Sequence, residues 1–452
     1  MIDAHRWKNH TPAWLPTPAL VAGVELAGPI APLQLDARQR AARLLVRVHG
    51  CPIGYADIVA GPAESIDRDR ILAALDPATA TRLRDHLGAD LQAQGVSASP
   101  RDADLAAILE RAVGLACTHN ASPTDGPLVT VAICTRDRTH CLGATLDSLL
   151  AQTYCPFEIL VVDNAPRSDA TERLVRTHYP HVRYVREPLP GLDWARNRAI
   201  VEAHGEIIAY IDDDAVADAR WLQALVAGFD SPEVMCVTGL VAPLRLETAA
   251  QELFERFGYS KGFYRLAFTI KAPPPHAGFP YKGFLGTGCN SAFRRAVFDQ
   301  VGLFDTRLDV GTPVPGAGDL DMFARIMRAG YTLRYEPDAI VFHDHIDDMP
   351  TLIAKMAQYQ QASIAYFTKY ILIDRDRALE LMAHVGWSYL RKTIRGLGAA
   401  ILRRDRPLAL VLRQALAAWL GPLALYRSYH QIQSRGYAHS QSPINAGPSA
   451  SL

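Results

Sequence analysis

The stretch "GEIIAYIDDDAVADARWL", Gly205 to Leu222, joins an apolar run to three consecutive aspartates. The apolar run predicts a buried strand, and the helical spacing that begins at "DARWLQALV" predicts a helix after it. Like charges this close destabilise one another unless a cation or strong hydrogen-bond donors compensate them. Asp212, Asp213 and Asp214 therefore mark the end of this strand as a candidate binding site.

The preceding residues alternate between strand and helix patterns. "LVTVAICT", "FEILVVDNA" and "VRYVRE" are predicted strands, and "CLGATLDSLLAQT", "ATERLVRTHY" and "LDWARNRAIVEAH" are predicted helices. Continuous apolar strands alternating with helices predict an α/β fold, with a mostly parallel, Rossmann-like sheet covered by helices on both faces. Ligands of such sheets bind at the carboxyl ends of the strands. Asp163 and the three aspartates stand at two of those ends.

Composition limits the class of protein. The chain is 49% hydrophobic and 21% charged with a formal net charge of zero, which is typical of a soluble globular protein and gives no broad electrostatic footprint for nucleic acid. Its seven cysteines form no C-x-x-C pair, so reduced thiols in a cytoplasm are expected. The N-terminus lacks the basic-then-apolar order of a signal peptide, which also predicts a protein that stays inside the cell.

Changes in hydrophobic periodicity and composition along the chain predict five segments. The N-terminal part has short alternating stretches and then helical spacing, with no motif that indicates chemistry. The predicted segments are a small N-terminal α/β domain at 1–118, a linker at 119–127, a catalytic domain at 128–350, a C-terminal helical region at 351–434 and a disordered tail at 435–452.

Two strand-end features favour a nucleotide ligand. Alternate side chains of an extended segment point the same way, so Asp212 and Asp214 can together form an oxygen-rich site for Mg²⁺ or Mn²⁺, which suits diphosphate oxygens. Alternatively, one of them caps the following helix, although Asp218 is better placed for that. Asp163 can accept a hydrogen bond from a nucleobase imide or a ribose hydroxyl, or it can simply start an Asx turn.

Later residues leave similar alternatives open. Arg196 can bind phosphate or pair with an aspartate, or it can be a surface helix charge. Gly286 and Gly288 allow the backbone to approach a ligand closely. Asp319 begins a predicted helix, where an ordinary N-cap competes with a catalytic role. His343 and His345 follow a predicted strand and are candidates for a metal site or for packing.

The ordered set "ICTRDR", "VVDN", "GLDWARN", "IDDD", "GTGCNSAFRR", "GDLDMFARIMRAGY" and "VFHDH" resembles the family 2 glycosyltransferases, which have the GT-A fold. The resemblance covers Val129 to His345, about half of the chain. It implies a metal-dependent, inverting hexosyltransferase-like enzyme of the polysaccharide-biosynthesis kind. The implied donor is a UDP-, dTDP- or GDP-sugar, and the implied acceptor is a hydroxyl of a saccharide or a lipid-linked glycan.

The resemblance also implies roles for matching residues. A departure from the family pattern is Gly318, which stands where the family has a glutamate before the catalytic aspartate. By resemblance, Asp319 is the catalytic base. Donor binding falls to Thr135, Arg136, Asp163, Arg196, Asp212 and Asp213, acceptor binding to Gly288, Asn290 and Asp321, and metal binding to Asp212, Asp214 and His343, with His345 in reserve.

Two other classes of function compete with this interpretation. A nucleotidyl or phosphoryl transferase would be expected to carry a phosphate loop such as G-x-x-x-x-G-K-[ST], and the sequence has none. A catalytically impaired nucleotide-sugar-binding protein is the alternative that Gly318 raises. Divalent-metal-dependent hydrolysis of a nucleotide sugar distinguishes the enzyme from the binding protein.

The C-terminal segment 391–427 carries eight basic residues and one acidic residue. Its longest uncharged run, between Arg413 and Arg427, has 13 residues, short of the roughly 20 that span a bilayer. A basic helix with Leu and Trp on its apolar side can lie peripherally on the inner face of the plasma membrane. The alternative is that these helices pack on the catalytic domain, with arginine stems covering apolar surface.

Overall fold

The computed structural model describes residues 14–95, 105–112, 114, 126–256, 259, 261–270, 285–403 and 406–434. The chain forms two compact units. The first unit joins residues 1–124 to 240–265 and 342–349, and the second contains 125–239, 266–341 and 350–452. The predicted domain boundaries stay predictions. The predicted tail at 435–452 and most of the predicted linker at 119–127 lie outside the described residues.

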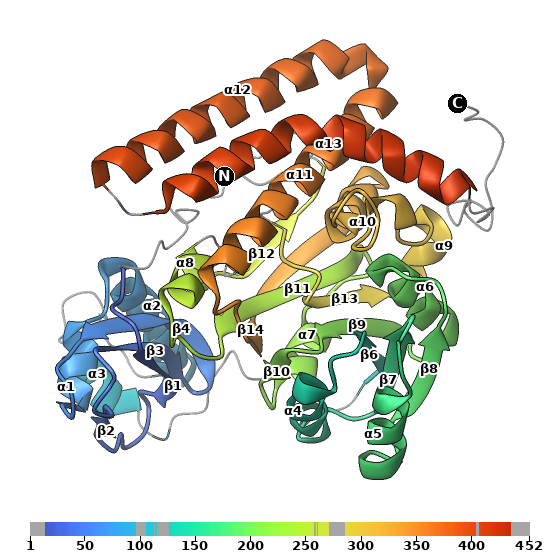
Figure 1. The fold of residues 1–452 in the computed structure, drawn as a ribbon. Helices are drawn as coiled ribbons and strands as arrows, with labels where there is room; N and C mark the ends of the chain where they lie inside the picture. Colours follow the sequence, from blue (N-terminus) through green and yellow to red (C-terminus); the bar gives the residue numbers. More distant parts are fainter. Residues whose placement is uncertain are drawn as a thin grey trace. The chain divides into compact units, whose positions relative to one another are not determined.

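The second unit is built on a mixed sheet with the strand order β10-β14-β11-β13-β9-β6-β7-β8, and β12 pairs with β14 (Figure 1). Four neighbouring strands are parallel: β9 pairs with β6, β6 with β7, and β7 with β8. These strands are β6 (Val129–Thr135), β7 (Phe157–Asn164), β8 (Arg183–Glu187) and β9 (Ile207–Asp212).

Helices connect the parallel strands and cover both faces. The chain moves outward from β6 to β8 through α4 (Thr139–Leu150) and α5 (Ala170–His178), then returns to β9 through α6 (Leu192–Glu202). Because such crossovers are right-handed, reversing the direction of travel places α6 on the opposite face from α4 and α5 (Figure 1). The predicted α/β fold class is confirmed.

The remaining strands of this sheet correct the prediction that the sheet is mostly parallel. β13 pairs antiparallel with both β9 and β11, and β12 pairs antiparallel with β14, so the sheet is mixed and not mostly parallel in these pairings. Hydrophobic periodicity indicates that a segment is a strand but not its direction, which the connections decide. These strands are β10 (Ala215–Ala217), β11 (Val234–Pro243), β12 (Leu266–Phe268), β13 (Asn290–Arg294) and β14 (Thr332–His343); β11 and β14 end within the first unit.

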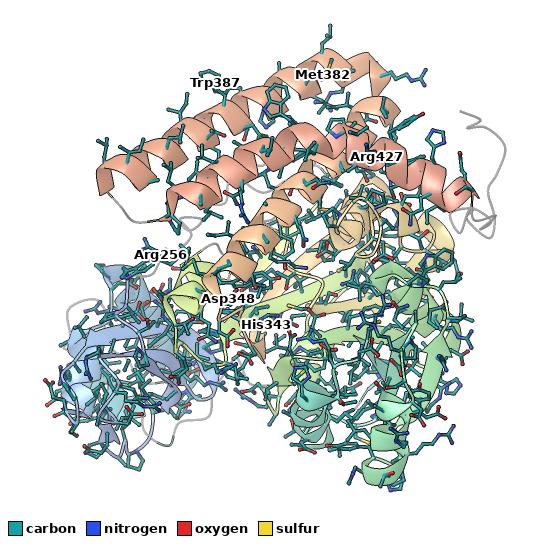
Figure 2. The ribbon with its side chains drawn as sticks, in the orientation of Figure 1. Arg256, His343, Asp348, Met382, Trp387 and Arg427 are labelled. Atoms are coloured by element: carbon teal, nitrogen blue, oxygen red, sulfur yellow. The ribbon has the colours of Figure 1, made fainter. Side chains whose placement is uncertain are left out.

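The predicted C-terminal helical region is present as α11 (Met349–Ile373), α12 (Ala378–Gly398) and α13 (Leu408–Ser434) (Figure 2). Buried Tyr366 and Tyr370 of α11 pack in one apolar cluster with Ala324 of α10 (Gly318–Arg328) and Leu425 of α13. This part of the helical region therefore shares a core with the catalytic fold. The other helices of this unit are α7 (Trp221–Ala227) and α9 (Val297–Val301), with the short turns η2 (Thr306–Leu308), η3 (Arg375–Arg377) and η4 (Ala399–Arg403).

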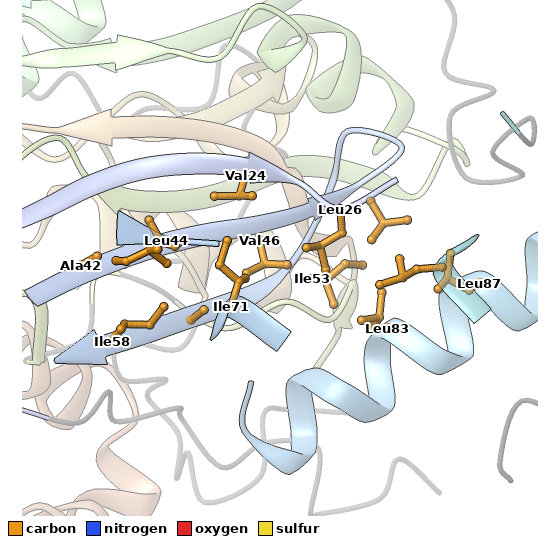
Figure 3. Packing of buried hydrophobic residues seen from close by; sticks show 14 of the residues in the cluster. Val24, Leu26, Ala42, Leu44, Val46, Ile53, Ile58, Ile71, Leu83 and Leu87 are labelled. Carbon is orange, nitrogen blue, oxygen red and sulfur yellow. The ribbon is translucent and has the colours of Figure 1, made fainter. Parts of the chain in front are cut away.

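The first unit is a small α/β body, as predicted. Its three-stranded sheet has the order β1-β3-β4, with β1 parallel to β3 and β3 antiparallel to β4. Apolar side chains of these strands, Val46 and Ile53 among them, pack against Leu83 and Leu87 of α2 (Figure 3). The elements are β1 (Ala19–Glu25), β2 (Leu33–Gln34), β3 (Ala41–Val48), β4 (Cys51–Val59), β5 (Ser65–Ile66), α1 (Arg68–Ala73), α2 (Pro77–Ala93), α3 (Leu105–Ala112) and α8 (Ala249–Arg256).

Candidate active site

The strand register brings the predicted strand-end residues to one edge of the sheet. Thr135, the last residue of β6, is the pairing partner of Asp163 on β7. Cys134, one residue earlier, is the partner of Asp212, which ends β9. Parallel strands therefore place Asp163, Thr135 and Asp212 in neighbouring positions at their carboxyl ends, where ligands of α/β sheets bind.

Asp213 is held inside the protein and fixes the turn after β9. Its Oδ2 accepts a hydrogen bond from Thr135 Oγ1 at 2.6 Å, and its backbone carbonyl accepts one from Thr145 Oγ1 at 2.9 Å. Arg138 Nη1 lies 2.9 Å from Asp213 Oδ1, and Arg138 Nη2 lies 2.7 Å from Asp214 Oδ2. Arg138 is therefore a counter-ion of two of the three consecutive aspartates.

Asp212 has an environment short of positive charge. Burial and then the charge of Asp214 raise the pKa of Asp212 to about 7, although Arg196 opposes the shift. Two carboxylates one residue apart at a strand end supply hard oxygen ligands of the kind that Mg²⁺ and Mn²⁺ prefer. A divalent cation would neutralise the negative charges of Asp212 and Asp214, so the two carboxylates are suitable ligands for such a cation.

Arg196 of α6 is buried among acidic groups. Its Nη1 donates to Asp193 Oδ1 at 3.0 Å, and its guanidinium lies 5.4 Å from the centre of the Phe304 ring. The charges of Asp193, Asp319 and Asp212 raise the pKa of Arg196 and outweigh burial. The guanidinium therefore links the carboxylates of three separate elements in one electrostatic centre.

Asp319 stands in the first turn of α10, and its carboxylate receives backbone N–H groups. Its Oδ2 accepts from Gly288 N at 3.0 Å and its Oδ1 from Leu320 N at 2.8 Å. The N-cap of the helix is Ala317, with φ of 83°, so Asp319 is not the cap. A Cβ at Gly288 would lie 2.6 Å from Arg196 Nη2, so glycine is required for this close approach.

Gly318 has a direct structural explanation. A Cβ built at this position would lie 1.8 Å from Asp193 Oδ2, so the carboxylate of Asp193 fills the space of a side chain at 318. Among the described residues, Asp193 Oδ2 is buried without a hydrogen-bond partner. Asp309 Oδ1 accepts from Asp193 N at 2.9 Å and so holds the start of α6 in place. The carboxylate that the family has at 318 is replaced in space by one from α6.

One carboxylate oxygen of Asp163 is buried without a hydrogen-bond partner among the described residues. The residue is fully buried, and its Oδ2 accepts a hydrogen bond from Tyr184 Oη at 2.9 Å. Its Oδ1 has no hydrogen-bond partner within the described residues. Burial raises the pKa of Asp163, and the hydrogen bond from Tyr184 only partly offsets this. Such an atom is suited to accept an N–H or O–H group of a bound molecule.

The two histidines after β14 interact with one another. His343 Nδ1 lies 3.1 Å from His345 Nδ1, and His345 Nε2 lies 3.0 Å from Glu255 Oε2. The His345 ring also contacts the Phe254 ring. In the sheet, β14 is the neighbour of β10, which begins directly after Asp214. The metal-binding role of His343 stays a prediction, with His345 as its supporting partner.

Comparison with known proteins identifies the central part of the chain. The family model described as Glycosyl transferase family 2 matches residues 130–302. The chain carries a glycosyl transferase family 2 domain. The matched range holds the parallel strands together with Asp163, Arg196, Asp212 and Asp214, so the resemblance to this family is confirmed.

Individual relatives share this family 2 region at low identity. A glucosyl-dolichyl phosphate glucuronosyltransferase of Haloferax volcanii is 27% identical over 39% of this chain and 56% of its own length. The glycosyltransferase AglE of the same organism is 26% identical over 66% of this chain and 93% of its own length. A pre-mycofactocin glycosyltransferase of Mycobacterium tuberculosis is 29% identical over 40% of this chain, which spans only 34% of that relative.

Among solved structures, the chain is similar to a mannosyltransferase from Pyrobaculum calidifontis in complex with GDP-Man and Mn²⁺. The sequences are 20% identical, the TM-score is 0.44, and the match covers 66% of this chain and 87% of that one. A second similar structure, GalNAc-T7 with UDP, GalNAc and Mn²⁺, has 18% identity and a TM-score of 0.38, and covers 52% of this chain and 47% of that one.

Two residues predicted to bind the acceptor already have hydrogen-bond partners inside the protein. Buried Asn290 donates from Nδ2 to Ala339 O at 2.9 Å and accepts from Trp221 Nε1 at 2.8 Å. Buried Asp321 accepts from Lys369 Nζ at 2.6 Å. The predicted acceptor-binding roles of Asn290 and Asp321 find no support in these contacts. The side chain of Arg136 is exposed, 4.0 Å from Asp137, and its donor-binding role stays a prediction.

Three residues of the site escaped sequence reasoning. Arg138 lies within the quoted motif "ICTRDR" and Asp193 within "GLDWARN", but only the tertiary structure shows which carboxylates they meet. Lys355 of α11 has no motif around it. Burial lowers the pKa of Lys355, while the charges of Asp212 and Asp214 oppose this, so Lys355 interacts electrostatically with the aspartate pair.

Proposed function

We propose that the family 2 domain transfers a sugar from a nucleoside-diphosphate sugar to a hydroxyl acceptor, with a divalent cation and inversion at the anomeric carbon. The observation that carries the proposal is the convergence of Asp193, Asp212 and Asp319 on the buried Arg196, beside the strand-end Asp163, in a chain with a domain of this family. The chain spans 25% to 56% of three of the curated relatives that it matches, so the activity of the whole protein is part of the proposal.

The donor nucleotide would bind at the carboxyl ends of β6, β7 and β9. The unpartnered Oδ1 of Asp163 would accept an N–H of the base or a ribose hydroxyl, beside Thr135 and Arg136. Asp212 and Asp214 would hold the divalent cation, with His343 as the third ligand. When bound, that cation would supply positive charge to the departing diphosphate.

The two nearby basic side chains would support the diphosphate. Arg138 pairs with Asp213 and Asp214, so it lies where negative charge is concentrated. Lys355 of α11 interacts electrostatically with Asp212 and Asp214. A diphosphate brings additional negative charge to this place, and the arginine fork and the ammonium group are both suited to stabilise phosphate oxygens.

Asp319 would remove the proton of the acceptor hydroxyl. The amide N–H groups of Gly288 and Leu320 hold its two carboxylate oxygens in a fixed orientation, which a base needs in order to meet the acceptor hydroxyl. Arg196 adds a positive charge on the same side. The acceptor oxygen would attack the anomeric carbon from the face opposite the leaving group in a single displacement, which inverts the configuration.

Asp193 would take the place of the missing glutamate at 318. Its Oδ2 occupies the volume of that side chain and has no hydrogen-bond partner among the described residues. Gly318 therefore does not by itself favour a catalytically impaired binding protein. That alternative predicts nucleotide binding without turnover.

The names of the relatives favour an acceptor of the cell envelope. They include a glucosyl-dolichyl phosphate glucuronosyltransferase, an O-antigen biosynthesis protein and a succinoglycan biosynthesis protein. We propose a saccharide or lipid-linked acceptor that is glycosylated at the inner face of the membrane. The UDP, dTDP and GDP sugars are all retained as donors.

The C-terminal helices offer a surface for that membrane. The exposed apolar residues of α12 are Leu379, Met382, Trp387, Leu390 and Ile394. Figure 2 labels Met382 and Trp387 on α12 and Arg427 on α13. On α13 the exposed apolar residues are Leu408, Leu412, Leu416, Trp419, Leu420, Leu423 and Tyr426.

We propose peripheral contact and not a membrane span. Among the described helices, α13 is the one that passes a test of length and composition for crossing a membrane, and 33% of its most apolar window is buried. Exposed Arg413 and Arg427 flank its apolar surface, as expected for a helix on anionic lipid. Sedimentation with anionic and neutral vesicles tests this. Binding to anionic vesicles that falls with salt supports it, and no binding at low salt contradicts it.

The experiment that tests the proposed activity has two stages. Thermal shift with UDP, dTDP and GDP, each with and without Mn²⁺, identifies the nucleotide. Hydrolysis of the corresponding nucleotide sugar is then measured with Mn²⁺ and with a chelator. Metal-dependent stabilisation followed by metal-dependent hydrolysis supports an enzyme; stabilisation without hydrolysis, or without transfer to any supplied acceptor, favours the binding protein.

A further inference from the structure

A second cluster of metal-ligating side chains lies in the first unit. His49 Nδ1 is 2.9 Å from Asp90 Oδ2, and His86 Nε2 is 3.2 Å from the same oxygen. His86 and Asp90 are four residues apart on α2, and His49 stands in the turn between β3 and β4. Asp90 is fully buried, and the side chains of His49 and His86 are only 10% and 7% exposed. Two imidazoles and one carboxylate thus converge from two elements.

The turn that carries His49 is built tightly. His49 and Gly50, with φ of 52° and 79°, form the two-residue connection between Val48 and Cys51. Hairpin turns with positive φ at both positions prefer Asn-Gly or Asp-Gly. Both oxygens of Glu25 hold this turn, accepting from His49 N at 2.9 Å and Gly50 N at 2.7 Å.

Histidine is enriched among non-glycine residues at positive φ, although asparagine and aspartate are the usual residues at the first position of such a hairpin turn. The side chain of His49 is directed at the buried carboxylate on α2. Non-glycine residues held at positive φ occur preferentially where the surrounding structure serves a function. The conformation of His49 is thus an observation separate from the closeness of the three ligand atoms.

We propose that His49 Nδ1, His86 Nε2 and Asp90 Oδ2 bind a zinc ion. The three ligand atoms lie within 4.8 Å of one another. A tetrahedral site with bonds of 2.0–2.1 Å has ligand atoms separated by about 3.3 Å. The two distances to Asp90 Oδ2, 2.9 Å and 3.2 Å, are within a few tenths of an ångström of this value, and the two imidazole nitrogens would approach one another by up to about 1.5 Å. Two imidazoles and one carboxylate favour Zn²⁺ over the harder Mg²⁺, and water takes the fourth position beside the partly exposed His49.

The zinc ion would join the β3–β4 turn to α2. These elements are about 40 residues apart in the sequence, and both belong to the packed core of the first unit (Figure 3). The proposal is independent of the sugar transfer, because all three ligands lie outside the family 2 domain. The competing explanation is a pair of ordinary hydrogen bonds from the two imidazoles to Asp90, which predicts no metal affinity.

The test uses the full-length chain carrying Asp214→Ala, so that the proposed donor cation site contributes nothing. Zn²⁺ binding is measured by calorimetry after chelator treatment, and Co²⁺ is used as a spectroscopic substitute. We expect one Zn²⁺ per chain, a higher melting temperature with zinc, and a visible Co²⁺ spectrum typical of four-coordinate nitrogen and oxygen ligation. No zinc binding above the level of weak surface contacts would overturn the proposal.

His49→Asn is the decisive variant, because asparagine suits the hairpin turn at least as well as histidine but has no imidazole. We expect it to keep its melting temperature without metal and to lose at least about tenfold in zinc affinity, since even outer-shell partners are worth that much to a metal site. His181→Asn, at an exposed histidine, is the matched control and should bind zinc normally. Equal zinc affinity in His49→Asn and His181→Asn would overturn the proposal.

Discussion

Two aspartates in the first turn of α10 are used in opposite ways. Asp321 is fully buried and accepts charged hydrogen bonds from Lys369 Nζ at 2.6 Å and Arg325 Nε at 2.8 Å. Asp319 is partly exposed, and its oxygens accept backbone N–H groups of Gly288 and Leu320. The carboxylate of Asp321 is paired with cations inside the core, whereas that of Asp319 is held by backbone amides and stays partly exposed.

The same contrast separates two larger groups of charges. Although burial opposes it, the charges of Lys369 and Arg307 hold the pKa of Asp305 well below its usual range. Burial raises the pKa of Asp193 to about 7, although Arg196 opposes the shift. The Asp305–Lys369–Asp321 group is thus electrostatically compensated. The group around Asp193 and Asp212 is not, and uncompensated buried carboxylates are characteristic of functional sites.

The largest expected effect is that of Asp319→Asn on the rate of transfer. The amide retains an oxygen for the backbone N–H groups but cannot accept the proton, so the rate should fall roughly 10²–10⁴-fold. Steady-state transfer with saturating donor and acceptor is the measurement. Donor affinity and melting temperature should stay unchanged. Transfer within about tenfold of the wild type would show that the base is another residue.

The next largest effect is on the stability of the protein and concerns the Asp305–Lys369–Asp321 group. Lys369→Met leaves Asp305 and Asp321 buried without their shared cation, and removing one partner of a buried ion pair costs about 3–5 kcal/mol of unfolding free energy. Urea unfolding measures it. Arg328→Met, which breaks a more exposed pair with Asp374, is the control and should cost about 1 kcal/mol or less. Equal losses in both variants would remove the distinction between the two groups.

A smaller effect tests whether Asp193 occupies the place of a side chain at 318. Gly318→Ala puts a methyl group against Asp193 Oδ2, and overpacking of this kind costs about 1–3 kcal/mol. Asp193→Gly removes the obstacle, so the double variant should lose less than the sum of the two single variants. Thermal unfolding of the four proteins provides the cycle. Strict additivity would mean that the two positions do not compete for space.

The smallest stability effect is expected at the exposed apolar residues of the C-terminal helices. Trp387→Ser together with Trp419→Ser changes side chains that are 64% and 85% exposed, so the unfolding free energy should change by only about 0.5 kcal/mol per site. Vesicle binding should nevertheless fall. A large loss of stability would show that these tryptophans pack in the folded protein.

Much of the candidate site was predictable because strand ends in an α/β sheet converge. The apolar runs before Asp163 and Asp212 predict both strand ends, and the register shows that these two ends flank the end of β6. A motif does not reveal the contacts of its polar residues. Asn290 and Asp321 lie in quoted motifs, and the structure adds that both are buried and hydrogen-bonded to Ala339 O and Lys369 Nζ; their acceptor-binding roles stay predictions.

Other features depend on packing that one-dimensional patterns do not carry. The antiparallel pairings of β13 were not foreseen, because strand direction depends on connections after β9. Gly318 departs from the family pattern, and the sequence does not show why. The structure explains the glycine, because the carboxylate of Asp193 occupies the space that a side chain at 318 would need. The roles of Arg138 and Lys355 were likewise not predictable from the sequence, because they depend on the aspartates that the fold brings near them.

The central claim is that the strand-end aspartates bind a nucleotide through a divalent cation, and calorimetry of Asp214→Ala tests it most directly. The wild type and this variant are titrated with the stabilising nucleoside diphosphate, with and without Mn²⁺, and Asp230→Ala, at an exposed aspartate, is the matched control. The wild type and the control should bind tightly only with Mn²⁺, and Asp214→Ala should lose the metal-dependent part while keeping its melting temperature. Metal-dependent affinity that is unchanged in Asp214→Ala would contradict the claim.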